Sequence, residues 1–175
     1  MPKRKHKIYS RPKRLYDKAR IEEENLLVKK YGLKSKREIW KADSAIEKIR
    51  KQAKLLLTKS TEEQAKFIEK LKKQGFATAS IADILALNKE DYLKRRLQSI
   101  VVAKKLATTP KQARQFIAHK HVAIDNKIIN IPSYLVRIDE EEQIELKLVK
   151  KEKNVKKGIE ETIESIKTAN QPGEK

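Results

Sequence analysis

The sequence contains no cysteine, which excludes disulfide bonds, thiolate catalysis and cysteine-based zinc sites. Glycine occurs only 4 times, too seldom for a glycine-rich nucleotide loop, and aromatic residues make up 5% of the chain. No run approaches the ~18 consecutive apolar residues that a membrane-spanning helix requires. Residues 1–14 hold no apolar run either, so we expect no secretory signal and no membrane association.

What the sequence has in excess is positive charge. Its 175 residues include 43 Lys and Arg against 24 Asp and Glu, which gives a formal net charge of +19 and a pI near 10.0. Such an excess is typical of proteins that bind a polyanion, most often a nucleic acid. Residues 92–124 hold eight basic residues and no acidic one. Because a solvated helix normally mixes both signs, this segment predicts a binding face.

The first half of the chain is expected to be helical. After a basic tail at residues 1–15, with two prolines and few apolar side chains, residues 16–91 place apolar residues at steps of three and four. That period is typical of helices that pack on one another. Gly32 is expected to end the first helix in a left-handed conformation. Ser35 and Glu38 predict a capping box at the start of the second.

Residues 92–150 are expected to form a second unit. One helix is predicted across residues 93–101, and another begins at Thr109, an N-cap residue that proline follows. The pattern then alternates, which predicts a hairpin that turns at residues 125–126 and a further strand. The fold class is therefore α+β, and residues 151–175 are expected to add a C-terminal helix and tail.

Two strings in this second unit resemble a known RNA-binding module. They are TPKQARQFIAHKHV at residues 109–122 and NIPSY at residues 130–134. Both are similar to strings in the small-subunit ribosomal protein S-four family, and they stand at the separation found there. The resemblance covers the whole chain. The basic start of the sequence and the run Arg96-Leu97-Gln98 are similar to the archaeal and eukaryotic branch, and we expect an archaeal member.

The resemblance implies a helical N-terminal domain followed by a module of two helices packed on a short bent sheet. It implies a cytoplasmic, non-enzymatic constituent of the small ribosomal subunit that binds and organises rRNA during assembly. It further implies a position near the site where mRNA enters, a contribution to translational accuracy, and neighbours from the ribosomal protein families numbered five and three. mRNA is a further candidate partner, and no homo-oligomer is expected. The alternative is a free RNA-binding factor for ribosome assembly or rescue.

Folded RNA is recognised mainly through its shape, phosphates and 2′-hydroxyl groups, so the candidate site residues are cations and neutral donors. Four of them, Arg96, Lys111, Arg114 and Lys120, are expected to contribute most, and reversing their charge should weaken rRNA binding without unfolding the domain. The candidates in the second unit are Lys94, Arg95, Arg96, Lys104, Lys105, Thr109, Lys111, Arg114, Gln115, His119, Lys120, Asn126 and Lys127.

The basic tail supplies a second set of candidates. Its arginines and lysines are expected on rRNA phosphates, and Tyr9 is expected to stack on a base. The tail candidates are Lys3, Arg4, Lys5, His6, Lys7, Tyr9, Arg11, Lys13 and Arg14.

Other chemistry has little support in the sequence. His119 and His121 could form a metal pair, but no carboxylate or thiol motif accompanies them, so RNA contact or local packing is favoured and no metal is expected. An RNA-modifying enzyme would need a catalytic domain, for which the residues before the module leave little room. We expect no cofactor. The acidic run at residues 139–142 is expected to be a solvated loop.

Overall fold

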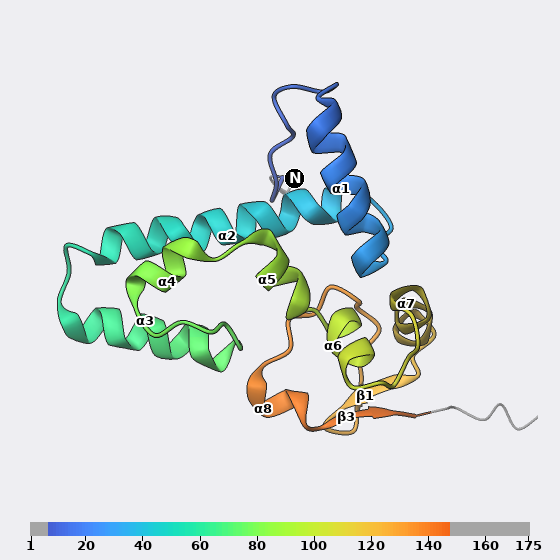
Figure 1. Ribbon diagram of the computed structural model, residues 1–175. Helices are drawn as coiled ribbons and strands as arrows, with labels where there is room; N and C mark the ends of the chain where they lie inside the picture. Colours follow the sequence, from blue (N-terminus) through green and yellow to red (C-terminus); the bar gives the residue numbers. More distant parts are fainter. Residues whose placement is uncertain (1–6, 148–175) are drawn as a thin grey trace, which may run out of the picture.

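The computed structural model describes residues 7–147, which form eight helices and one three-stranded sheet (Figure 1). This arrangement confirms the expected α+β class. The C-terminal helix and tail expected over residues 151–175 lie outside the described residues. Among the described helices, none combines the length and the apolar character that a membrane crossing requires.

The N-terminal helices are organised around one long helix. In Figure 1, α1 crosses the N-terminal end of α2, while α3, α4 and α5 lie along α2. The apolar stripe of α2 is buried at Ile39, Ala42, Ile46 and Ala53, where it contributes to two neighbouring cores. The bounds are α1 Lys18–Tyr31, α2 Arg37–Leu56, α3 Thr61–Lys73, α4 Ile81–Ala86 and α5 Lys89–Lys94.

The predicted capping box at the start of α2 is wrong. Helix α2 begins at Arg37, its N-cap position is Lys36, and no side chain caps it. Ser35 therefore does not cap this helix. The Glu38 carboxylate accepts a hydrogen bond from the Lys34 backbone N–H at 3.2 Å. It also accepts hydrogen bonds from two arginines of the second unit. A capping box does form at α4, between Ser80 and Asp83.

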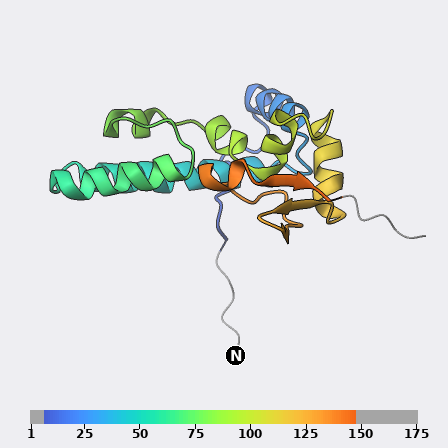
Figure 2. The same cartoon turned by 90° about the horizontal axis from the view of Figure 1, so that it is seen from below.

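The C-terminal module packs helices α6 and α7 on the sheet around one core, to which Leu97, Val101, Ile117 and Val122 contribute. The sheet is antiparallel in the order β2-β1-β3. Figure 2 shows α2 and α3 extending away from this module. The bounds are α6 Leu97–Ala103, α7 Pro110–Ala118, β1 Val122–Ile124, β2 Lys127–Ile128, α8 Ile138–Glu141 and β3 Ile144–Leu146.

Two local predictions in the module have different outcomes. The hairpin is confirmed, because Asp125 and Asn126 take positive φ angles of 48° and 62°, as a two-residue turn of the favoured twist requires. The single helix across residues 93–101 is wrong. The chain leaves the helical path at Arg95 and Arg96, where the Arg96 backbone forms an isolated bridge with Leu135.

Four helices end in the same left-handed backbone conformation. The φ angles are 57° at Gly32, 81° at Gly75, 58° at Lys105 and 64° at Lys120. Glycine adopts this conformation freely, whereas a residue with a Cβ atom loses about 1–2 kcal/mol there. The N-terminal helices α1 and α3 thus end on glycine, and the module helices α6 and α7 end on lysine.

Candidate nucleic-acid interface

One carboxylate joins the helical part to the module. Glu38, near the start of α2, accepts from Arg96 Nη1 at 2.9 Å and from Arg114 Nη2 at 2.9 Å. Arg96 is the residue that precedes α6, and Arg114 lies in α7. We call Glu38, Arg96, Arg114 and their neighbour Gln98 the Glu38 cluster. It holds the two module helices, α6 and α7, in a fixed position against α2.

Gln98 extends the same contact to α1. Its Nε2 atom lies 3.0 Å from the Tyr31 carbonyl oxygen, 3.1 Å from that of Gly32 and 2.8 Å from that of Pro110. Its Oε1 atom accepts from Arg114 Nη1 at 3.3 Å. A buried amide with both ends engaged in this way fixes the orientation of every element it touches. The C-terminal end of α1 therefore meets the first turn of α7.

The electrostatics of the Glu38 cluster are those of a protected ion pair. Burial raises the pKa of Glu38, but Arg114 and Arg96 lower it by a larger amount. The pKa of Glu38 therefore lies below its usual value. The Arg96 side chain is only 5% exposed and that of Glu38 is 16% exposed. The carboxylate thus stays ionised between two guanidinium groups in a site with little solvent.

This geometry engages two of the strongest candidates within the protein. Arg96 is buried and Arg114 is half-buried, and the guanidinium group of each forms an ion pair with Glu38. Reversing the charge of Arg96 would place two carboxylates together in a buried site, so we expect such a variant to be destabilised as well as weakened in RNA binding. Both arginines position α6 and α7.

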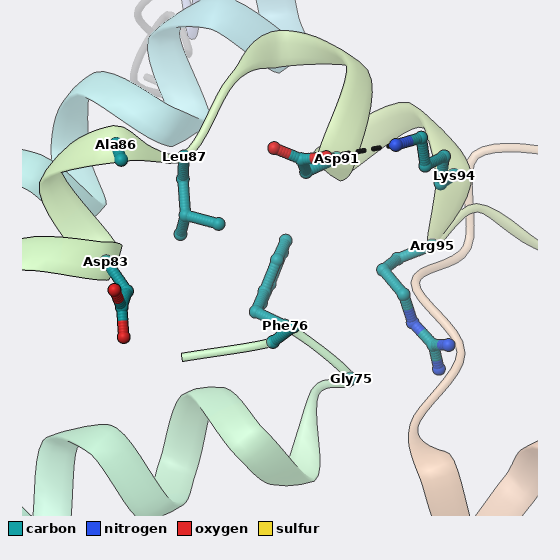
Figure 3. Close-up of a pocket in the computed structure, with 9 residues that line it drawn as sticks. Gly75, Phe76, Asp83, Ala86, Leu87, Asp91, Lys94 and Arg95 are labelled. Atoms are coloured by element: carbon teal, nitrogen blue, oxygen red, sulfur yellow. Dashed lines mark hydrogen bonds and ion pairs between the residues drawn. The ribbon is translucent and has the colours of Figure 1, made fainter. Parts of the chain in front are cut away.

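Arg95 is also engaged inside the protein. Its Nη1 donates to Glu141 at 2.8 Å and its Nη2 to the Val136 carbonyl at 2.8 Å. The guanidinium lies directly over Gly75, at the end of α3, where an added Cβ atom would have to displace it. Figure 3 shows Arg95 beside Gly75 at one end of a hollow of about 440 Å³.

The acidic run at residues 139–142 differs from the solvated loop that was expected. Much of it forms helix α8, in which Glu141 pairs with Arg95 and Glu140 accepts from the Tyr134 hydroxyl at 3.0 Å. Lys94, the residue before Arg95, forms an ion pair with Asp91 at 3.2 Å and is exposed. Part of the positive charge of residues 92–124 is therefore balanced by acids from other segments.

The remaining cationic candidates of the module lie at or near its surface. Lys105, Lys111, Lys120 and Lys127 are exposed and Lys104 is half-buried, and none of the five has an ion pair within residues 7–147. They lie at the ends of α6 and α7, in the first turn of α7 and in the hairpin. We call these five residues the outward lysines.

The neutral candidates also divide into residues that are exposed and residues whose side chains contact other parts of the chain. Gln115, one helical turn after Lys111, and His119 are exposed and available to a ligand. The Thr109 hydroxyl accepts from the Gln112 N–H at 3.3 Å as the N-cap of α7, as the sequence predicts. Asn126 Oδ1 accepts from Lys147 Nζ at 2.8 Å.

The tail candidates are partly engaged too. Lys3, Arg4, Lys5 and His6 lie outside the described residues. Lys7, Arg11, Lys13 and Arg14 are exposed, whereas the half-buried Tyr9 ring lies 5.9 Å from the Trp40 ring, centroid to centroid. Tyr9 therefore packs on α2 in this structure, which differs from the expected base-stacking role.

The two histidines of the HKH string lie close together at the end of α7. The His119 and His121 rings are stacked, with centroids 6.3 Å apart. In the part of the chain that the structure describes, no three His, Asp or Glu side chains gather as a metal site would need. His121 also lies edge-on to Phe116 at 6.3 Å, so local packing explains its position.

Comparison with known proteins agrees with this division into a helical part and a module. The S4 domain family matches residues 95–142. The small ribosomal subunit protein uS4 of Methanosphaera stadtmanae is 41% identical over 150 residues, which cover 82% of this chain and 82% of that protein. The protein of the same name from Methanoregula boonei is 44% identical over 154 residues, which cover 82% of this chain and 83% of that protein.

A third relative gives the same result. The small ribosomal subunit protein uS4 of Saccharolobus islandicus strain L.S.2.15 is 44% identical over 151 residues, which cover 82% of this chain and 83% of that protein. These relatives come from archaea and are ribosomal proteins rather than enzymes, as the resemblance implies. The chain therefore belongs to the uS4 family of small ribosomal subunit proteins.

Proposed function

We propose that this chain is a structural constituent of the small ribosomal subunit in the cytoplasm and that it binds small-subunit rRNA through the outward lysines. The observation that carries the proposal is the 41–44% identity to small ribosomal subunit proteins across 82% of the chain. The free lysines on the module supply the chemistry, because an ammonium group acts as a point charge for phosphate.

The proposed mechanism separates contact from positioning. Lys105, Lys111, Lys120 and Lys127 neutralise phosphates, and Gln115 with its neighbour His119 adds hydrogen bonds to phosphates or 2′-hydroxyl groups. The Glu38 cluster and Arg95 hold α6 and α7 rigidly, so that the backbone that carries these cations does not need to be ordered when RNA binds. Pre-organisation of this kind reduces the entropy lost on association.

Family membership supports the finer functions that the resemblance implies. We extend the proposal to the organisation of rRNA during subunit assembly, to a place near the site where mRNA enters, and to a contribution to translational accuracy. Neighbours from the ribosomal protein families numbered five and three, and mRNA itself, are the proposed further partners.

Sedimentation tests the cellular part of the proposal. A tagged copy of the chain in an archaeal host should appear in small subunits at one copy per subunit on a sucrose gradient. Its absence from mature subunits, together with its presence on precursor particles, would instead establish the alternative of a free assembly factor. Absence from both would refute a ribosomal role altogether.

Salt dependence tests the chemical part. A variant with Lys105, Lys111, Lys120 and Lys127 changed to Gln should bind transcribed small-subunit rRNA more weakly, and the slope of log K against log salt should fall by about one unit per lysine. The matched control changes four lysines that are ion-paired within the chain, Lys30, Lys36, Lys59 and Lys73. A smaller loss is expected there. Equal losses in both variants would contradict the assignment of the outward lysines.

A further inference from the structure

The ends of α6 and α7 repeat a motif that this chain builds elsewhere with glycine. At the end of α3, the Gly75 N–H donates to the Lys72 carbonyl and the Phe76 N–H to the Leu71 carbonyl. This pair of hydrogen bonds defines the Schellman motif, in which one residue must be left-handed.

The same two hydrogen bonds recur at the module helices. At the end of α6, Lys105 N–H donates to the Val102 carbonyl at 2.9 Å, and the N–H of the next residue donates to the Val101 carbonyl at 3.1 Å. At the end of α7, Lys120 N–H donates to the Ile117 carbonyl at 3.0 Å, and the N–H of the next residue donates to the Phe116 carbonyl at 2.9 Å. Lysine thus stands where the backbone favours glycine.

Packing helps to explain why glycine, and not lysine, occupies positions 32 and 75. A Cβ atom on Gly32 would lie 2.8 Å from the Pro110 Cβ and 3.1 Å from Gln98 Nε2, and one on Gly75 would collide with the Arg95 guanidinium. At Gly32 the φ angle and the close approach of Pro110 both favour glycine, and at Gly75 the φ angle favours glycine while an added Cβ atom would displace the Arg95 guanidinium from its contacts. Another residue at either position would therefore disturb a contact with the module.

Nothing within residues 7–147 compensates for the lysines. Lys105 and Lys120 are exposed, and the hydrogen bonds and ion pairs of the described chain include neither side chain. Glycine would fit both positions without strain. A strained backbone that local contacts do not explain is a feature that concentrates at functional sites.

We infer that Lys105 and Lys120 are phosphate anchors for the RNA backbone, kept at left-handed positions at the expense of stability. The inference rests on the proposed function. Each anchor has a fixed base, because the residue after it is hydrogen-bonded into the last helical turn and packs against that turn, Leu106 within the module core and His121 against Phe116. The point from which each lysine side chain leaves the backbone is therefore fixed, although its ammonium group remains mobile until it meets a phosphate.

Substitution by glycine separates this inference from a purely structural role. Lys105→Gly and Lys120→Gly should each raise the Tm of the protein by about 2–4 °C, since they relieve strain in a chain of this size. Each should weaken binding to transcribed small-subunit rRNA several-fold and lower the salt slope by about one unit. A more stable protein that binds RNA less well is the expected result.

Two further variants control for charge and for backbone. Lys105→Gln keeps the strain and removes the charge, so it should weaken RNA binding without the rise in Tm. Lys111→Gly removes a lysine from the regular first turn of α7, where glycine is unfavourable, so it should weaken binding and lower the Tm.

Each contrary result is decisive. An unchanged or lower Tm in both glycine variants would show that the lysines stabilise their helix ends and would overturn the inference. Unchanged rRNA affinity and salt slope in both, while wild-type protein binds with a steep salt dependence, would also overturn it but leave the proposed function standing. Absence of wild-type binding to rRNA would refute the proposed function itself.

Discussion

The positive charges of residues 92–124 serve two different purposes in two regions of the molecule. Towards α2, Arg96 and Arg114 turn inward and pair with Glu38 at 2.9 Å each. At the ends of α6 and α7, lysines such as Lys105 and Lys120 have no ion pair within the described residues. The arginine fork suits a buried, multiply hydrogen-bonded carboxylate, whereas lysine offers a mobile point charge to solvent or phosphate.

This difference shows why a count of charges along the sequence overestimates the positive charge of a binding surface. The acids that neutralise the arginines come from distant segments, Glu38 in α2 and Glu141 in α8. A segment can therefore lack acids in sequence and still be partly neutral in space. The outward lysines, not the whole segment, carry the charge that is free to attract a polyanion.

The largest expected effect comes from removing the carboxylate that the arginines share. Glu38→Gln leaves the Arg96 guanidinium buried without a counter-charge. We expect a loss of about 3 kcal/mol in the free energy of unfolding, at the lower end for a broken buried ion pair because Glu38 keeps some solvent contact. Urea unfolding followed by circular dichroism measures it.

The matched control for this substitution is Glu63→Gln. Glu63 forms an exposed ion pair with Lys59 at 3.2 Å, and its loss should change stability by less than about 0.5 kcal/mol. If Glu38→Gln destabilises no more than Glu63→Gln, the interior role of the arginines is wrong. RNA binding by folded Glu38→Gln should keep the wild-type salt slope, because no cation has been removed.

The second largest effect concerns the junction that Gln98 completes. Gly32→Ala forces a Cβ atom into a left-handed position and to 2.8 Å from Pro110 Cβ, so α7 must shift away from α1. We expect a loss of about 2 kcal/mol, made of the conformational penalty and the displaced packing. Differential scanning calorimetry should show a lower Tm.

Lys105→Ala is the control for this second prediction. Its φ angle of 58° matches that of Gly32, but the wild-type residue already carries a Cβ atom in an exposed position. Its stability should therefore remain within about 0.5 kcal/mol of wild type. A loss as large as that of Gly32→Ala would mean that the Lys105 side chain stabilises its helix end, and it would contradict the view that this side chain contributes nothing to the fold.

Local signals explain which parts of the fold could be predicted from the sequence. Thr109 with the following proline predicts the start of α7, Gly32 predicts the end of α1, and the dipeptide at residues 125–126 predicts the hairpin turn, because each acts through its own backbone neighbourhood. Ser35 does not cap α2 because the helix begins two residues later, at Arg37, and the Glu38 carboxylate accepts from the Lys34 N–H and from two arginines that only the folded chain brings near.

The candidate site was harder to predict for the same reason. Whether Arg96, Arg114 or Arg95 faces a ligand depends on acids 46 to 76 positions away in the sequence. Gln98 stood out only as a mark of one branch of the family, and its three carbonyl partners belong to segments that no periodicity connects. The left-handed lysines had no signal, since a Schellman motif is usually identified by its glycine.

The smallest expected effect is the response of the Glu38 cluster to acid. The pKa of Glu38 lies below its usual value, because Arg114 and Arg96 outweigh the opposite effect of burial. A carboxyl group with a lowered pKa contributes stability that is fully present above its unfolded pKa of about 4.5 and is lost as the pH falls through the folded value. Wild-type stability should therefore fall more steeply than that of Glu38→Gln below about pH 4.5.

Comparison of the two proteins isolates this contribution. Glu24, Asp83 and Glu90 also have lowered pKa values, but they titrate alike in wild type and in Glu38→Gln. The difference between the two urea-unfolding curves should thus narrow steadily from pH 5 to pH 2.5. The change should be smaller than the loss at neutral pH, because a protonated Glu38 still accepts hydrogen bonds from both arginines. Parallel curves across this range would show that the arginines do not hold the carboxylate ionised.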